Sequence, residues 1–215
     1  MKTRILIADD HAVVRIGLRA LLEAQNDMSV VGTANNGREA VEKTGLLRPD
    51  VVLMDISMPD LNGIEATRLI CSQHPSVRVV ILSMHYTNEF VFRAMRAGAR
   101  GYLLKESAGG EVVKAVRTVM RGSRYLGKGV ELGRDEDAAE KAGRLKSPLD
   151  SLSERERETL QLVAEGKTSA EIALALGLSP KSVETYRSRL MKKLGVKTIP
   201  ALVKFAVQHG VTSLD

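Results

Sequence analysis

The feature that most constrains this chain is an alternation, repeated five times over its first 121 residues, of a short apolar run and a stretch with helical periodicity. Short apolar runs between turn residues are typical of strands buried on both faces, and apolar spacings of three and four are typical of amphipathic helices. Such strands need right-handed crossover connections, so the pattern predicts an α/β fold with a doubly wound, five-stranded parallel sheet. The strands are expected at residues 5–8, 30–34, 51–54, 79–82 and 101–104, and the helices at residues 12–25, 37–47, 63–73, 88–97 and 109–121.

The alternation stops at residue 126, where the composition changes. Residues 127–146 contain four glycines and ten charged residues with little apolar periodicity. This composition is typical of a solvated linker. We therefore expect a first domain at residues 1–126, a linker at 127–147 and a second domain at 148–215.

The second domain carries helix signals and no strand signals. Ser153 and Thr168 are each followed three residues later by glutamate, the pattern of a capping box, and Ser179 is followed by proline at the first helical position. Gly177 supplies a tight turn between two helices, which is typical of a helix-turn-helix. With a last helix at residues 199–209, we expect an all-α domain of four helices.

Composition excludes several classes of protein. No apolar run approaches the roughly eighteen residues of a membrane-spanning helix, and the first residues do not form a signal-peptide core. The only cysteine, Cys71, has no partner for an internal disulfide, which suits a reducing compartment. We expect a cytoplasmic protein that does not interact with a membrane.

Polar residues follow four of the predicted strands. Ligands of doubly wound sheets bind in the crevice beyond the carboxyl ends of the strands, so these side chains should converge there. Clustered carboxylates need a hard cation or a lysine to compensate their charge, and oxygen ligands suit Mg²⁺. This combination favours phosphoryl transfer to a carboxylate. The residues are Asp9, Asp10, Asp55, Ser83 and Lys105.

Four motifs give this half of the chain a family resemblance. Residues 7–11, 54–63, 81–85 and 97–105 resemble the receiver domain of response regulators, a flavodoxin-like fold, and the match extends over residues 3–122. The resemblance implies that Asp55 accepts a phosphoryl group and that Lys105 contacts it. It also implies a Mg²⁺ site and a pair of switch residues. The implied metal ligands are Asp9, Asp10, Asp55 and the backbone carbonyl of Ser57, and the implied switch residues are Ser83 and Tyr102.

The helix expected at residues 180–194 has two distinct faces. When Val183 is placed in the core and each residue advances 100°, Leu190 and Leu194 fall within about 20° of it. Six basic residues and one acid lie between positions 181 and 197, a pattern that indicates a contact surface for phosphates. The face opposite Val183 carries Lys181, Thr185, Ser188 and Lys192, flanked by Glu184 and Arg189.

The second domain also resembles a known family. Residues 152–156, 165–173 and 179–190 are similar to the four-helix LuxR-type domain of NarL/FixJ regulators, over about residues 148–211. The resemblance implies that the last helix, with Leu202, Val203 and Val207, mediates dimerisation. The alternative is that these residues only form part of the core of the helical domain. The resemblance also implies that Lys181, Glu184, Thr185 and Ser188 face bases, and that Tyr186, Arg189 and Lys192 lie nearer phosphates.

Together the motifs predict a two-component response regulator rather than an enzyme. Because no kinase domain or ATP-binding loop is recognisable, the phosphoryl group is expected from a histidine kinase. The other expected partners are double-stranded promoter DNA and a second copy of the chain. A haloacid-dehalogenase-type phosphatase would require an acid two residues after Asp55, where this chain has Ser57. A receiver that regulates DNA binding without phosphorylation is the other alternative.

Overall fold

The computed structural model describes residues 2–84, 87–130 and 147–212. These residues fall into two compact units, residues 2–130 and residues 147–212. Most of the expected linker, residues 131–146, lies outside the described residues. No helix within the described ranges is long and apolar enough to cross a membrane.

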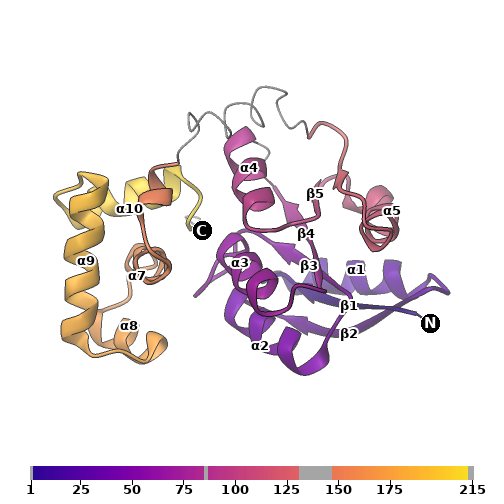
Figure 1. Cartoon of the computed structure of the whole chain (residues 1–215), viewed down its shortest axis with the longest axis horizontal. Helices are drawn as coiled ribbons and strands as arrows, with labels where there is room; N and C mark the ends of the chain where they lie inside the picture. Colours follow the sequence, from indigo (N-terminus) through magenta and orange to yellow (C-terminus); the bar gives the residue numbers. More distant parts are fainter. Residues whose placement is uncertain (1, 85–86, 131–146, 213–215) are drawn as a thin grey trace. The chain divides into compact units, whose positions relative to one another are not determined.

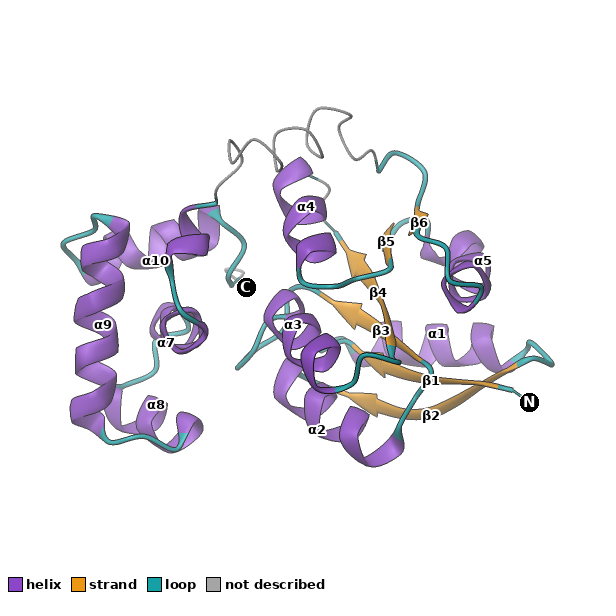
Figure 2. Ribbon diagram, viewed as in Figure 1, coloured by secondary structure: helices purple, strands orange, loops and turns teal. Residues whose placement is uncertain are grey.

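The first unit is built on a parallel sheet with the strand order β2-β1-β3-β4-β5-β6 (Figure 2). The five predicted strands are all present, each within two residues of its expected bounds. The doubly wound parallel sheet predicted from the alternating pattern is therefore confirmed. The strands are β1 (Thr3–Ala8), β2 (Met28–Ala34), β3 (Val51–Asp55), β4 (Arg78–Ser83), β5 (Gly101–Leu104) and β6 (Tyr125–Leu126).

Helices cover both faces of this sheet (Figure 1). α1 (Ala12–Glu23) and α5 (Ala108–Met120) lie on one face, and α2 (Gly37–Leu47), α3 (Gly63–Gln73) and α4 (Asn88–Arg96) lie on the other. Successive residues of β1 enter different cores, because side chains alternate across a strand. This double coverage explains why the strands read as continuous apolar runs.

The sixth strand, β6, was not predicted, because two residues are too short to show a period. It extends the sheet beyond β5, where the backbone N–H of Gly127 donates to the carbonyl of Tyr102 at 2.9 Å. The carboxylate of Glu111 accepts from the Tyr125 hydroxyl at 3.1 Å. Val130 is only 6% exposed. Gly127 and Val130 of the expected linker are therefore buried against the first unit, whereas Lys128 and Gly129 between them are exposed.

The second unit is entirely helical, as predicted. Both expected capping boxes are present, at Ser153 and at Thr168, and Gly177 ends a helix in the left-handed conformation with φ of 64°. Leu160 and Leu202 are fully buried in its single core. The elements are a short 3-10 helix (Pro148–Ser151), α7 (Glu154–Ala164), α8 (Ser169–Leu176), α9 (Pro180–Leu194) and α10 (Ile199–Gln208).

Gly63, at the start of α3, is required for the close approach of that helix to β3. A Cβ atom at this position would lie 1.8 Å from the carbonyl oxygen of Asp55. Gly63→Ala must therefore displace backbone, and we expect it to lower the free energy of unfolding of the first unit by about 3 kcal/mol, the upper end of the usual cost of overpacking. Urea denaturation measures this change.

Gly109→Ala, in the first turn of α5, is the matched control. A Cβ atom there meets nothing within 4 Å, and alanine favours the helix, so stability should stay level or rise by up to about 1 kcal/mol. Equal effects of the two substitutions would show that the contact with Asp55 does not matter.

Candidate functional site

The sequence-predicted polar residues converge at the carboxyl edge of the sheet. Asp9 directly follows β1, Asp55 ends β3, Ser83 ends β4 and Lys105 directly follows β5. In a parallel sheet these strand ends lie at the same edge. Backbone pairing therefore brings together residues that are up to 96 positions apart.

Lys105 joins two buried carboxylates. Its Nζ lies 2.9 Å from Oδ2 of Asp9 and 2.8 Å from Oδ2 of Asp55. The side chain of Asp9 is fully buried, that of Asp55 is 3% exposed and that of Lys105 is 11% exposed. Removing these charges from water carries a cost, and the contacts with the ammonium offset part of it.

The pKa values of Asp55 and Lys105 reflect this burial and pairing. Burial raises the pKa of Asp55 to about 6, while Lys105 lowers it and Asp9 raises it further. Burial alone would lower the pKa of Lys105, but its contacts with Asp55 and Asp9 outweigh that effect and raise it. Near neutral pH, Asp55 is therefore mostly ionised and Lys105 is protonated, as a nucleophile and a cationic partner require.

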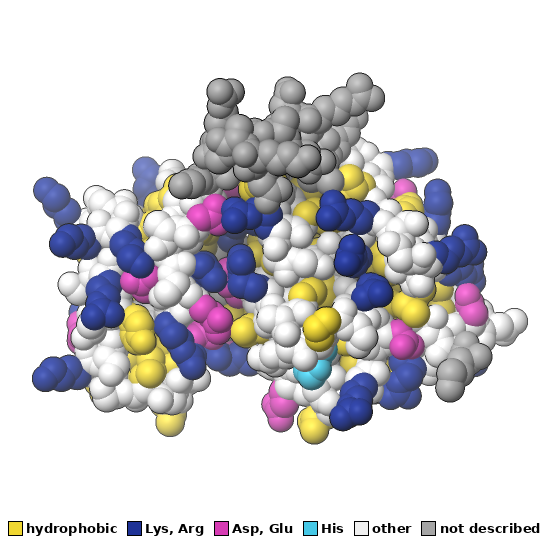
Figure 3. Space-filling model, viewed as in Figure 1, with side chains coloured by type: hydrophobic (Ala, Val, Ile, Leu, Met, Phe, Trp, Pro, Cys, Tyr) yellow, Lys and Arg dark blue, Asp and Glu magenta, His cyan; other side chains and the backbone are white. Residues whose placement is uncertain are grey.

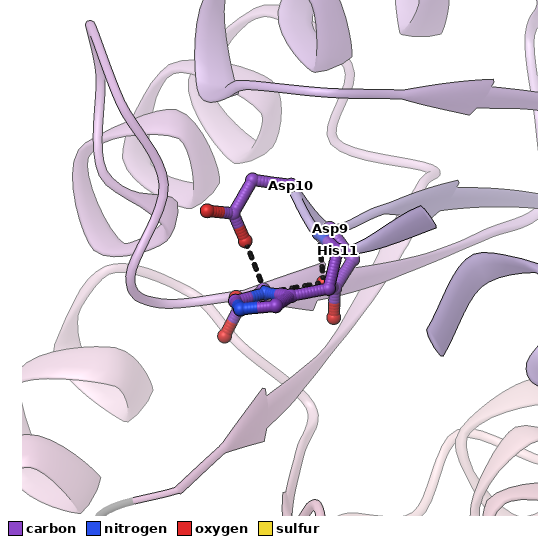
Figure 4. Close-up of side chains that lie close together, drawn as sticks. Asp9, Asp10 and His11 are labelled. Atoms are coloured by element: carbon purple, nitrogen blue, oxygen red, sulfur yellow. Dashed lines mark hydrogen bonds and ion pairs between the residues drawn. The ribbon is translucent and has the colours of Figure 1, made fainter. Parts of the chain in front are cut away.

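Asp10 and His11 complete the acidic pocket, and Figure 4 shows them next to Asp9. Their side chains are more exposed than that of Asp9, at 28% and 65%. The Nδ1 atom of His11 lies 2.7 Å from Oδ1 of Asp10 and 3.4 Å from Oδ1 of Asp9. Side-chain ligand atoms of Asp9, Asp10, His11 and Asp55 all lie within 4.8 Å of one another. One lysine ammonium does not balance three carboxylates, and a set of carboxylate oxygens suits a hard divalent cation, so these residues fit a metal ion.

Ser83 and Tyr102 form a buried pair next to Asp55. Ser83 is 1% exposed, Tyr102 is fully buried, and their hydroxyls are linked by a hydrogen bond. Burial raises the pKa of Tyr102 to about 12, the bond with Ser83 lowers it, and the charge of Asp55 raises it. The backbone carbonyl of Ser83 also accepts from the N–H of Lys105 at 2.8 Å. Both predicted switch residues therefore lie beside the pocket.

Ser57 is half-buried in the loop after β3. It follows Asp55 by two positions, which suits the metal role that the family resemblance implies for its carbonyl.

α9 places its predicted apolar stripe against the second core. Val183 and Leu190 are fully buried, and Leu194 is partly buried against the same cluster. Tyr186 is half-buried. The other predicted contact residues are exposed: Lys181, Glu184, Thr185, Ser188, Arg189 and Lys192. Lysine and arginine side chains also project along the edge of Figure 3 where α9 runs in Figure 1.

Some of the basic residues of this stretch serve the fold. Nζ of Lys193 lies 2.7 Å from Oε2 of Glu156, whose side chain is 4% exposed, and 3.0 Å from the carbonyl of Ser151. Arg187 pairs with Glu184 on the same helix. The count of six basic residues therefore overstates the charge available for a ligand.

Comparisons with known proteins agree with this geometry. Residues 5–117 match the family model of the response regulator receiver domain, and residues 150–206 match that of the LuxR family of bacterial regulatory proteins. Transcriptional regulatory protein MctR of Rhizobium johnstonii is 40% identical over 212 residues, which cover 99% of this chain and 96% of MctR. The chain belongs to the NarL/FixJ family of response regulators. It is a transcriptional regulator and not an enzyme.

Other relatives of this response regulator match over nearly their whole length. Response regulator UvrY of Escherichia coli is 38% identical over 213 residues, covering 98% of this chain and 96% of UvrY. RcsB of Salmonella enterica, solved on the promoter rprA with the phosphomimetic BeF₃⁻, matches with a TM-score of 0.63 and 27% identity. That match covers 95% of this chain and 98% of RcsB.

Besides Arg187, sequence reasoning missed three residues that contact predicted site residues in this response regulator. His11 lies against Asp10, as described above, and Arg15 donates to the carbonyl of Asp9 at 2.6 Å. Ser169 donates to the carboxylate of Glu184. The adjacency of His11 to two aspartates was a visible signal, whereas the other two contacts depend on how helices are placed.

Proposed function

We propose that this response regulator accepts a phosphoryl group on Asp55 from a histidine kinase and that phosphorylation controls the binding of α9 to promoter DNA. The observation that carries the proposal is the ammonium of Lys105, which lies within 2.9 Å of both Asp9 and Asp55 in a pocket of carboxylates. This places a nucleophile beside a group that can neutralise charge on phosphoryl oxygens.

In the proposed reaction, a carboxylate oxygen of Asp55 attacks the phosphorus of a phosphohistidine. The phosphorus–nitrogen bond breaks, the imidazole leaves and Asp55 becomes an acyl phosphate. Lys105 pairs with the developing charge on the phosphoryl oxygens. Asp9, Asp10, Asp55 and the Ser57 carbonyl would hold Mg²⁺, which when bound supplies further positive charge for those oxygens.

The switch in this proposal is the hydroxyl pair of Ser83 and Tyr102. Phosphorylation adds about −1.5 to −2 charges at Asp55. Ser83 ends β4, at the same edge of the sheet as Asp55. Its hydroxyl is therefore expected to donate to the new phosphoryl oxygens instead of to Tyr102. A charge-assisted hydrogen bond is stronger than a neutral one, which favours this exchange.

The DNA-binding part of the proposal assigns residues 1–126 to the receiver, 127–147 to the linker and 148–215 to the reading domain. Lys181, Glu184, Thr185 and Ser188 would face bases, and Tyr186, Arg189 and Lys192 would approach phosphates. Two copies paired through α10 would bind half-sites about one helical turn, 10–10.5 bp, apart.

Two measurements on the full chain test this proposal. Incubation with Mg²⁺ and acetyl phosphate should give an acyl phosphate detectable by mass spectrometry, and chelation of the metal should abolish it. Selection from random duplex DNA should enrich one sequence, more strongly after phosphorylation. Enrichment that is indifferent to the phosphodonor would favour the alternative, a receiver that regulates DNA binding without phosphorylation.

Lys192→Ala should weaken binding to all duplex sequences alike. Lys192 is exposed on α9, and each lysine that contacts a phosphate contributes about −0.9 to the slope of log K against log salt. We therefore expect the slope to become shallower by about 0.9 in an anisotropy titration. Lys2→Ala removes the same charge from the first unit and should leave the slope unchanged. A wild-type slope in Lys192→Ala would exclude a phosphate contact.

A further inference from the structure

The only acid on the predicted reading face of α9 is held in place by two other side chains. Ser169, the first residue of α8, donates its hydroxyl to Oε1 of Glu184, and Arg187 donates to Oε2. The Glu184 side chain is nevertheless 47% exposed. Its carboxylate is therefore fixed from two sides and still open to solvent.

These two contacts lower the cost of bringing the Glu184 carboxylate close to DNA. A lone glutamate would be repelled by phosphates, but the guanidinium of Arg187 compensates its charge. A free glutamate side chain also loses rotamer freedom when it binds, and the bond from α8 has already restricted that freedom. A carboxylate accepts about four hydrogen bonds, so Ser169 and Arg187 leave acceptor sites on Glu184 for a ligand.

The chemistry of the major groove selects the base that fits such an acceptor. Guanine presents only acceptors, and thymine presents an acceptor beside a methyl group. Adenine presents its N6 amino donor next to the N7 acceptor, which repels a carboxylate. Cytosine presents the N4 amino donor without a neighbouring acceptor. A preorganised carboxylate that cannot donate therefore matches cytosine best.

We infer that Glu184 determines specificity for a C·G pair and that Ser169 is the positioning residue that fixes its carboxylate. This inference rests on the proposed function of α9. Thr168, and not Ser169, caps the amino end of α8. The Ser169 hydroxyl is therefore not needed for capping and can hold the Glu184 carboxylate.

The test is selection of binding sites from random duplex DNA by the full, phosphorylated chain. The wild type should strongly prefer a C·G pair at one position of the selected site. Glu184→Ala should reduce that preference by about five- to 150-fold and leave the preferences at the other positions unchanged. Glu184→Gln should shift that position toward adenine, because an amide can pair with both N6 and N7. Ser169→Ala should cause a partial loss at that position alone.

Glu154→Ala, an exposed glutamate in the first turn of α7, is the charge-matched control and should give the wild-type preference. Equal melting temperatures of all variants would confirm that they are folded. An unchanged preference in Glu184→Ala would overturn the inference, and a loss in that variant but not in Ser169→Ala would overturn the positioning role. Failure of the wild type to enrich any sequence would instead overturn the proposed function.

Discussion

Asp55→Asn is expected to reduce phosphorylation by acetyl phosphate below detection. The substitution preserves the shape of a side chain that is almost fully buried and keeps the backbone of β3. It removes the nucleophilic carboxylate and leaves a neutral amide, which does not form an acyl phosphate. Intact-mass measurement after incubation with Mg²⁺ and the donor, followed by mapping of the modified peptide, checks the result.

Asp27→Asn makes the same chemical change at an exposed site of the first unit. Asp27 pairs with Arg117 at 2.9 Å, away from the residues of the pocket, so its variant should be phosphorylated like the wild type. Undiminished label in Asp55→Asn, on Asp9 or Asp10 for example, would show that the nucleophile is misassigned.

Leu190→Ala is expected to destabilise the second unit by about 2–5 kcal/mol, the usual cost of truncating a buried leucine. Leu190 is fully buried at the centre of the second core, on the side of α9 opposite its exposed residues. Because a helical unit this small has only a few kcal/mol of stability, DNA binding should be largely lost. Phosphorylation of Asp55 should persist, since the two units have separate cores.

Leu174→Ala supplies the control for that experiment. Leu174 lies on α8 and is 87% exposed, so the same truncation should change stability by no more than about 0.5 kcal/mol. Denaturation followed by circular dichroism measures both variants. Loss of phosphorylation in Leu190→Ala would contradict independent folding of the two units.

The elements that the sequence predicted best are those whose burial leaves either a continuous apolar run or a periodic apolar pattern. Residues 5–8 and 51–54 read as strands because helices cover them on both sides, which leaves continuous apolar runs that are too short for a helix. The helix at 180–194 followed from one apolar stripe together with the serine cap before it and the proline at its first position. The positions of the strand ends then predicted that Asp9, Asp55 and Lys105 converge, because the topology of a parallel sheet brings those ends to one edge.

The features that sequence did not predict depend on contacts between distant residues. β6 forms because Glu111 and the edge of β5 hold two residues in place, and neither contact leaves a local pattern. The bond from Ser169 to Glu184 spans 15 residues and depends on how α8 packs against α9. Periodicity reports which face of a helix is buried, but not which side chain of a neighbouring helix it meets.

The central claim is that the state of Asp55 controls the affinity of the second unit for DNA. The direct measurement is the dissociation constant of the full chain for its selected site, with and without acetyl phosphate, at constant salt. A charge-assisted hydrogen bond contributes about 1.5–3 kcal/mol, so we predict a gain in affinity of at least about tenfold for the wild type. Asp55→Asn should show no gain. Equal affinities of the wild type with and without the donor, under conditions where mass spectrometry shows full phosphorylation, would contradict the account.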